Sequence, residues 1–150
     1  MRRLRSLSGS ALLIGVLSTA CAADSGPITV DGARIGEPTG PNAALYLTAT
    51  SNGGPDRLVG AHTVVADVVE IHRTTIDGDG VIAMERADSL DLPAAGSLVL
   101  EPGGLHVMLV DVDRLEAGDV VEVTLIWETA GEMTVEAEIV EPADTMSHER

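Results

Sequence analysis

The sequence has almost no cysteine and very few aromatic residues. Its 150 residues include one cysteine, Cys21, no phenylalanine, one tyrosine (Tyr46) and one tryptophan (Trp127). A single cysteine cannot form an intramolecular disulfide. Because Cys21 lies at the end of a leader, the domain that follows has no thiolate for catalysis or metal binding. Two isolated aromatic residues do not form the stacking platforms on which nucleic-acid bases bind. We therefore expect no thiolate chemistry and no nucleic-acid partner.

Positive charge is also scarce. Lysine is absent, and nine arginines stand against 24 acidic residues, which gives a formal charge of −15 at pH 7. Three of these arginines lie within the first five residues, so the chain without its leader carries six basic and 24 acidic residues, a charge of −18. Such a surface repels nucleic acid and anionic lipid and attracts cations. Solubility in a salty environment is the simplest interpretation of most of this charge.

Residues 1–20 have the pattern of a signal peptide. Arg2, Arg3 and Arg5 precede an apolar run over residues 11–17, which is too short to span a bilayer. The leader ends in Leu17-Ser18-Thr19-Ala20-Cys21, which resembles a bacterial lipobox.

The lipobox resemblance implies that Cys21 is acylated and becomes the first residue of the mature protein. The protein would then be an exported lipoprotein, anchored at the outer face of the cell membrane or in the periplasm, with residues 21–26 as a tether. Ser18 stands where an aliphatic residue is more usual. Ordinary cleavage near Ala22 or Ala23, which would release a soluble secreted protein, therefore stays open.

Residues 27–140 have the pattern of an all-β domain. Short runs of β-branched and apolar residues alternate with turn signals about every ten residues, and no sustained helical period or internal repeat occurs. We predict an antiparallel Greek-key β-sandwich, followed by a disordered polar tail over residues 141–150. The main predicted strands cover residues 43–50, 57–61, 64–72, 81–85, 97–101, 103–110, 120–127 and 133–140. His72 would then end its strand, and His62 would lie in a loop.

The stretch Gly103–Val110 carries the first sign of a binding site. In a strand, successive side chains point to opposite faces, so His106 and Met108 share one face while Val107 and its apolar neighbours point into the core. An imidazole and a thioether on one face can chelate a soft metal ion. The alternative is a strand that carries a histidine and a methionine near a sheet edge for no such purpose.

Two earlier residues complete a larger pattern. Eleven residues separate His72 from Met84, twenty-one separate Met84 from His106, and one separates His106 from Met108. This spacing, with the flanking segments Val69-Glu70-Ile71-His72 and Glu101–Leu109, resembles the PCu(A)C (DUF461) family of extracytoplasmic copper(I) chaperones. The resemblance covers roughly residues 43–140. Some members carry a further methionine after the first histidine, where this chain has Arg73.

The resemblance implies a cupredoxin-like fold and a copper(I) site formed by His72, Met84, His106 and Met108. Thioethers are soft, neutral ligands that favour copper(I) over zinc, magnesium and calcium, and imidazole must be neutral to coordinate. It further implies a monomeric metallochaperone that delivers copper to a respiratory oxidase subunit, another cuproprotein or another copper carrier. The tail residues Met146 and His148 repeat the same chemistry and could hold a second copper weakly.

Two other functions remain open at this point. One is a copper-scavenging or buffering lipoprotein without a dedicated recipient. The other is a purely structural β-sandwich lipoprotein, which predicts that His72 and His106 lie far apart in the fold. No Gly-x-Ser-x-Gly or other nucleophile motif occurs, so we expect no enzymatic activity.

Overall fold

A computed structural model describes residues 27–38, 40–76, 78 and 80–141. Cys21, the tether over 21–26, Met146 and His148 lie outside the described residues. Within the described ranges no helix is long and apolar enough to cross a membrane. Regular structure there consists of strands: β1 (Ile28–Gly36), β2 (Ala43–Ser51), β3 (Asp56–His62), β4 (Ala66–Ile76), β5 (Ile82–Arg86), β6 (Leu90–Leu92), β7 (Ser97–Leu100), β8 (Leu105–Val112), β9 (Val120–Trp127) and β10 (Gly131–Val140).

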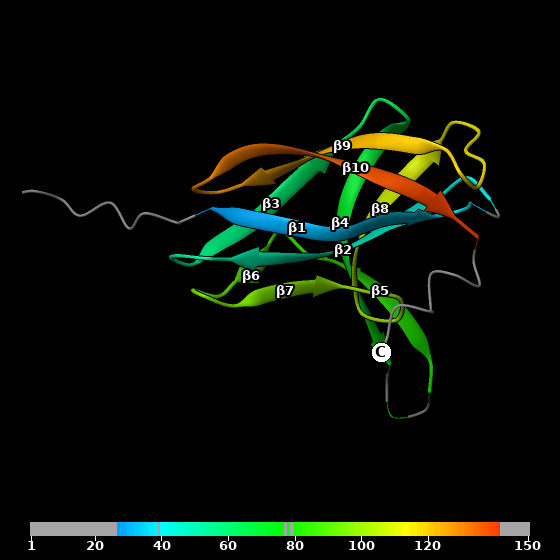
Figure 1. Cartoon of the computed structure of the whole chain (residues 1–150). Helices are drawn as coiled ribbons and strands as arrows, with labels where there is room; N and C mark the ends of the chain where they lie inside the picture. The colour runs from blue at the N-terminus through cyan, green and yellow to red at the C-terminus, as the bar shows by residue number, and fades with distance from the viewer. Residues whose placement is uncertain (1–26, 39, 77, 79, 142–150) are drawn as a thin grey trace, which may run out of the picture.

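The strands form one curled sheet, which confirms the all-β prediction. The strand order is β5-β4-β8-β2-β1-β10-β9-β3-β6, and β7 pairs with β2 outside this path. The sheet folds over on itself: β4 and β8 cross behind the layer of β1, β10 and β9 (Figure 1), and β3 contacts β4 although the two are distant in the strand order. One pair departs from the antiparallel pattern, because β1 runs parallel to β10, with Arg34 opposite Glu138.

The core is filled by the alternate residues of the strands. In β2 the buried positions recur every second residue, and β9 buries Val121, Val123, Leu125 and Trp127 in the same way. In β8, Val107 and Leu109 point into the core, as the alternation predicts. The opposite face of β8, which carries His106 and Met108, is thereby left for other contacts.

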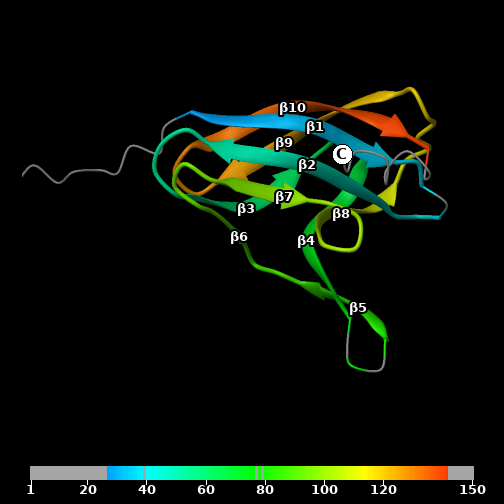
Figure 2. The same cartoon turned by 60° about the horizontal axis from the view of Figure 1, so that its bottom comes forward.

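Strand β4 is longer than the sequence predicts. It extends to Ile76, so His72 lies within the strand and the expectation that it ends the strand is wrong. The cause is pairing: residues 72–76 form an antiparallel ladder with β5, and this ladder extends the strand past the main sheet. Figure 2 shows the resulting β4–β5 hairpin projecting from the body of the domain. His62 is likewise not in a loop, since it ends β3 opposite Thr124.

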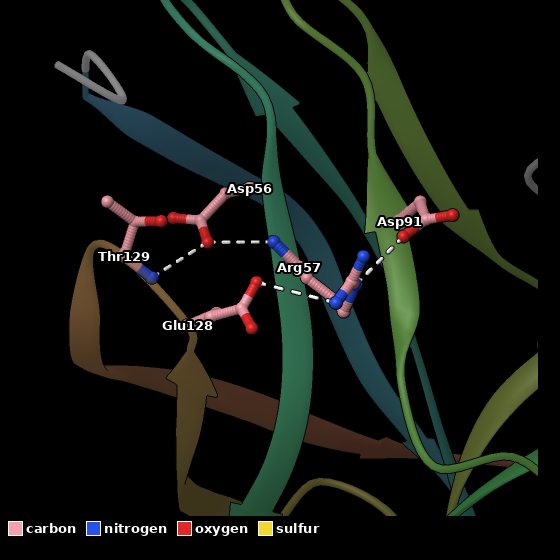
Figure 3. Close-up of polar contacts among 5 residues, drawn as sticks. All are labelled: Asp56, Arg57, Asp91, Glu128 and Thr129. Atoms are coloured by element: carbon pink, nitrogen blue, oxygen red, sulfur yellow. Dashed lines mark hydrogen bonds and ion pairs between the residues drawn. The ribbon is translucent and has the colours of Figure 1, made fainter. Parts of the chain in front are cut away.

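A buried carboxylate fixes the opposite end of the domain. Asp56, only 7% exposed, accepts hydrogen bonds from the backbone N–H groups of Arg57 (2.7 Å), Thr129 (2.9 Å) and Ala130 (2.9 Å). Burial alone would raise the pKa of Asp56, but these donors outweigh it and hold the pKa below its usual value. Asp56 thus ties the β9–β10 turn to the start of β3. Beside it, the Arg57 guanidinium lies between the carboxylates of Asp91 and Glu128, as Figure 3 shows.

Candidate metal centre

Strands β4 and β8 bring the two predicted histidine ligands together. In the antiparallel register His72 lies directly opposite His106, and such pairs project from the same face of a sheet. The centroids of the two imidazole rings are 5.7 Å apart, with an interplanar angle of 68°. The structural alternative predicted a large separation between these rings, and the short distance contradicts it.

The two predicted methionine ligands project from the same face. Met108 follows His106 by two residues in β8 and lies opposite Glu70 of β4. Met84 lies in β5 opposite Thr74, which is two residues beyond His72, so it is a diagonal neighbour of His72. Diagonal neighbours have backbone separations of about 7–8 Å, within reach of long side chains. Met84 is 58% exposed, since it belongs to the projecting hairpin.

One ring nitrogen of His106 has no hydrogen-bond partner in the part of the chain that the structure describes. Its Nδ1 lies 3.3 Å from the carbonyl oxygen of Gly104. Because a carbonyl only accepts, we assign the proton to Nδ1, which leaves the lone pair on Nε2. This Nε2 is buried and has no hydrogen-bond partner in the described part of the chain. Burial lowers the pKa of His106, the Gly104 carbonyl opposes this, and nearby His72 lowers the pKa further. The ring is therefore neutral at neutral pH, as coordination requires.

His72 makes its hydrogen bond through Nε2, the ring nitrogen that His106 leaves free. Its Nε2 lies 2.9 Å from Oε2 of Glu70, while its Nδ1 is buried and has no partner among the described residues. The second carboxylate oxygen of Glu70 accepts a hydrogen bond of 2.7 Å from Nη1 of Arg86. A buried polar atom without a partner costs free energy, so two such nitrogens on adjacent rings indicate a site that binds something.

An aromatic residue borders the histidine pair. The Tyr46 ring of β2 lies 6.4 Å from the His106 ring, and the Arg34 guanidinium lies 5.8 Å from the Tyr46 centroid. Burial raises the pKa of the Tyr46 phenol, against an opposing effect of Arg34, so this neighbour is uncharged at neutral pH. Sequence reasoning assigned no role to Glu70, Arg86 or Tyr46. A signal for Glu70 exists, because it precedes His72 by two residues and therefore shares its face of the strand.

The chemistry of the four predicted ligands determines which ions they would suit. Two imidazoles and two thioethers are neutral and contain soft sulfur, a combination that favours a soft, singly charged ion. Within the described ranges no group of three or more His, Cys, Asp or Glu side chains is placed to hold a metal.

Comparison with solved structures defines the class of domain. The copper-bound PCuAC domain from PmoF2 is 28% identical, with a TM-score of 0.65 over 81% of this chain and 97% of that domain. The apo PCuAC domain from PmoF1 is 31% identical (TM-score 0.68; 79% and 98%), and CuI-DR1885 from Deinococcus radiodurans is 32% identical (TM-score 0.61; 83% and 84%). These similarities confirm both the PCu(A)C resemblance and the cupredoxin-like fold.

Comparison of sequences gives the family. Residues 28–139 match the family described as "Putative lipoprotein LpqE-like", and the chain belongs to this family. A related protein from Leifsonia xyli subsp. xyli, described as "Putative lipoprotein Lxx21020", is 29% identical over 137 residues, which cover 83% of this chain and 81% of that protein.

Proposed function

We propose that this protein is an extracytoplasmic copper(I)-binding metallochaperone whose ligands are His72, Met84, His106 and Met108. The observation that carries the proposal is the cross-strand histidine pair, in which each ring has one buried nitrogen without a hydrogen-bond partner among the described residues. The register adds one thioether from the same strand as His106 and one from the adjacent hairpin. The relatives described as copper-bound support copper as the ion.

The exposure of the ligands supports release by ligand exchange. His106 is 3% exposed and Met84 is 58% exposed, so the four groups range from the protein interior to the solvent. A thioether binds copper(I) without charge, and its loss from the ion leaves no buried anion behind. We expect the ligands of a recipient protein to displace Met84 first and the histidines last. No thiolate of this domain would compete for the ion.

X-ray absorption on the copper(I)-loaded protein tests the ligand set. We expect about two sulfur and two nitrogen neighbours of copper, and the loss of the sulfur contribution in a Met84→Ala/Met108→Ala variant. In competition with a chromophoric copper(I) chelator, this variant should bind at least about 100-fold more weakly, since even outer partners of metal ligands contribute 10–100-fold. Met133→Ala is the control, because Met133 packs against the core in β10. If wild type binds no more tightly than the double variant, the proposal is wrong.

We further propose that the protein is a lipoprotein acylated at Cys21 that delivers copper to a respiratory oxidase or another cuproprotein. The lipoprotein description of its family and the sequence before Cys21 support the anchor.

In a strain that lacks the gene we expect less copper in the oxidase, restored by the wild-type gene. A Cys21→Ala variant should leave the membrane fraction. If oxidase copper is unchanged and only copper tolerance falls, the protein is a copper buffer; if Cys21→Ala stays in the membrane fraction, the lipid anchor is wrong.

A further inference from the structure

The contacts of Glu70 link the histidine pair to the projecting hairpin. Its Oε2 lies 2.9 Å from Nε2 of His72, and its Oε1 lies 2.7 Å from Nη1 of Arg86 in β5. The side chains of His72 and Glu70 are 16% and 23% exposed, whereas that of Arg86 is 68% exposed. Glu70 and His72 are therefore largely shielded from solvent, whereas the Arg86 side chain that contacts Glu70 is exposed.

We infer that Glu70 is a positioning residue that fixes the His72 ring so that Nδ1 binds the metal, while His106 binds through Nε2. This inference rests on the proposed function. It specifies which histidine nitrogens of that site coordinate the metal and which residue orients His72. Glu70 does not contact the metal in this arrangement. It acts through the hydrogen bond that it accepts from His72.

The chemistry of the two acceptors explains why opposite nitrogens are used. An ionised carboxylate can only accept, so His72 places its proton on Nε2 and keeps the lone pair on Nδ1. The Gly104 carbonyl also only accepts, but it faces Nδ1 of His106, so there the lone pair stays on Nε2. In both rings the free lone pair belongs to the buried nitrogen that has no hydrogen-bond partner within residues 27–38, 40–76, 78 and 80–141. Carboxylate and carbonyl partners of this kind orient metal-bound imidazoles and strengthen them as donors.

Arg86 keeps Glu70 in place. In β5 it lies directly opposite His72 and two residues from Met84, so it comes from the strand that supplies a predicted sulfur ligand. A guanidinium only donates, and by binding Oε1 it leaves Oε2 free to accept from His72. The Arg86–Glu70 ion pair therefore connects Glu70, which orients His72, to the strand that carries Met84.

Direct coordination of copper by Glu70 is the competing interpretation. Glu70 lies opposite Met108 and on the same face as the four predicted ligands. A carboxylate is a hard ligand, however, which copper(I) does not favour beside imidazole and thioether donors. In addition, both oxygens of Glu70 already accept short hydrogen bonds.

Nuclear magnetic resonance of protein labelled with ¹⁵N-histidine tests the assignment, because copper(I) is diamagnetic. We would record ring nitrogen shifts of apo and copper(I)-loaded protein at pH about 8, above the ordinary histidine pKa of about 6.5. In wild type we expect His72 to carry its proton on Nε2 in both states, with the Nδ1 shift changing on loading. The His106 ring should behave in the reverse way, with its proton on Nδ1 and the Nε2 shift changing.

Three test variants and one control separate positioning from charge. Glu70→Ala should give a mixture of His72 tautomers and weaken copper(I) binding by about 10-fold or more. Arg86→Ala should weaken binding by at most about fivefold, and Arg86→Lys should restore most of it. Glu85→Ala is the matched control: it removes one carboxylate from the same hairpin, opposite Arg73 and on the other face, and should leave both tautomers and affinity unchanged.

The outcomes distinguish failure of the inference from failure of the proposed function. If wild type binds no copper(I), both fail. If wild type binds but Glu70→Ala keeps its affinity and a single His72 tautomer, only the inference is overturned. If X-ray absorption on loaded wild type shows a third oxygen or nitrogen neighbour of copper that Glu70→Gln lacks, Glu70 coordinates copper directly and the inference is also overturned. Circular dichroism checks the fold, and if Glu70→Ala does not fold, Glu70→Gln carries the same test, because its amide can donate as well as accept and so loses the single tautomer.

Discussion

Replacing His106 by leucine should weaken copper(I) binding by at least about 100-fold while leaving the fold intact. His106 is the most buried of the four predicted ligands, at 3% exposure, and its Nε2 has no partner among the described residues. Loss of a direct ligand must cost more than loss of an outer partner, which typically costs 10–100-fold in affinity. Leucine has a similar volume and no lone pair, so it removes coordination without opening a cavity. Competition titration with a chromophoric copper(I) chelator measures the change.

The stability of this variant distinguishes a ligand from a structural histidine. His106→Leu loses the hydrogen bond to Gly104, about 1 kcal/mol, but it also removes a buried nitrogen whose desolvation is uncompensated. We therefore expect the midpoint of thermal unfolding of the apo protein to change by only a few degrees. His62→Leu is the control, since His62 is an exposed histidine at the end of β3 and should bind copper(I) like wild type. Unchanged affinity in His106→Leu would remove His106 from the ligand set.

Replacing Asp56 by alanine should lower the free energy of unfolding by about 3 kcal/mol. The carboxylate accepts three backbone hydrogen bonds, and a hydrogen bond to a charged group contributes about 1.5–3 kcal/mol net. Thr129 and Ala130 are exposed, so water can partly replace the lost acceptor and the total stays below the sum of three such bonds. Alanine would leave the N–H groups of Thr129 and Ala130 without their acceptor and loosen the turn between β9 and β10. For a domain of this size the midpoint of thermal unfolding should fall by about 10 °C. Scanning calorimetry measures both values.

The contribution of Asp56 should depend on pH in a defined direction. Its pKa in the folded protein lies below the ordinary value, because the backbone donors outweigh the effect of burial. The stabilisation is therefore fully present above the unfolded pKa of about 3.9, and it is lost as the pH falls through the lower folded pKa. The difference in stability between wild type and Asp56→Asn should be largest near neutral pH and shrink in acid. Asp91→Asn, whose side chain is 83% exposed, should show no comparable effect. A difference that stays constant from neutral to strongly acidic pH would contradict the prediction.

The sequence by itself determined the fold class, the two faces of the strand that carries His106 and Met108, and the candidate ligands. Period-two alternation is a local property, so Val107 and Leu109 could be assigned to the core and His106 and Met108 to the other face before any pairing was known. The all-β class and the family resemblance carried by the spacing from His72 to Met108 were confirmed. The roles of these four residues as ligands, and that of Cys21 as the acylated residue, stay predictions.

Only the tertiary structure decided which residues face one another. Alternation states which face a side chain occupies, but the partner strand and its register depend on packing between segments far apart in the chain, such as β4 with β8 and β1 with β10. For the same reason, the prediction from sequence that the strand ends at His72 was wrong. The ladder with β5, which extends β4, depends on both strands. The tertiary structure also decides which ring nitrogen each histidine leaves free. Glu70 lies within hydrogen-bond distance of Nε2 of His72, and the Gly104 carbonyl lies within that distance of Nδ1 of His106. Neither distance can be derived from the spacing of residues in the sequence.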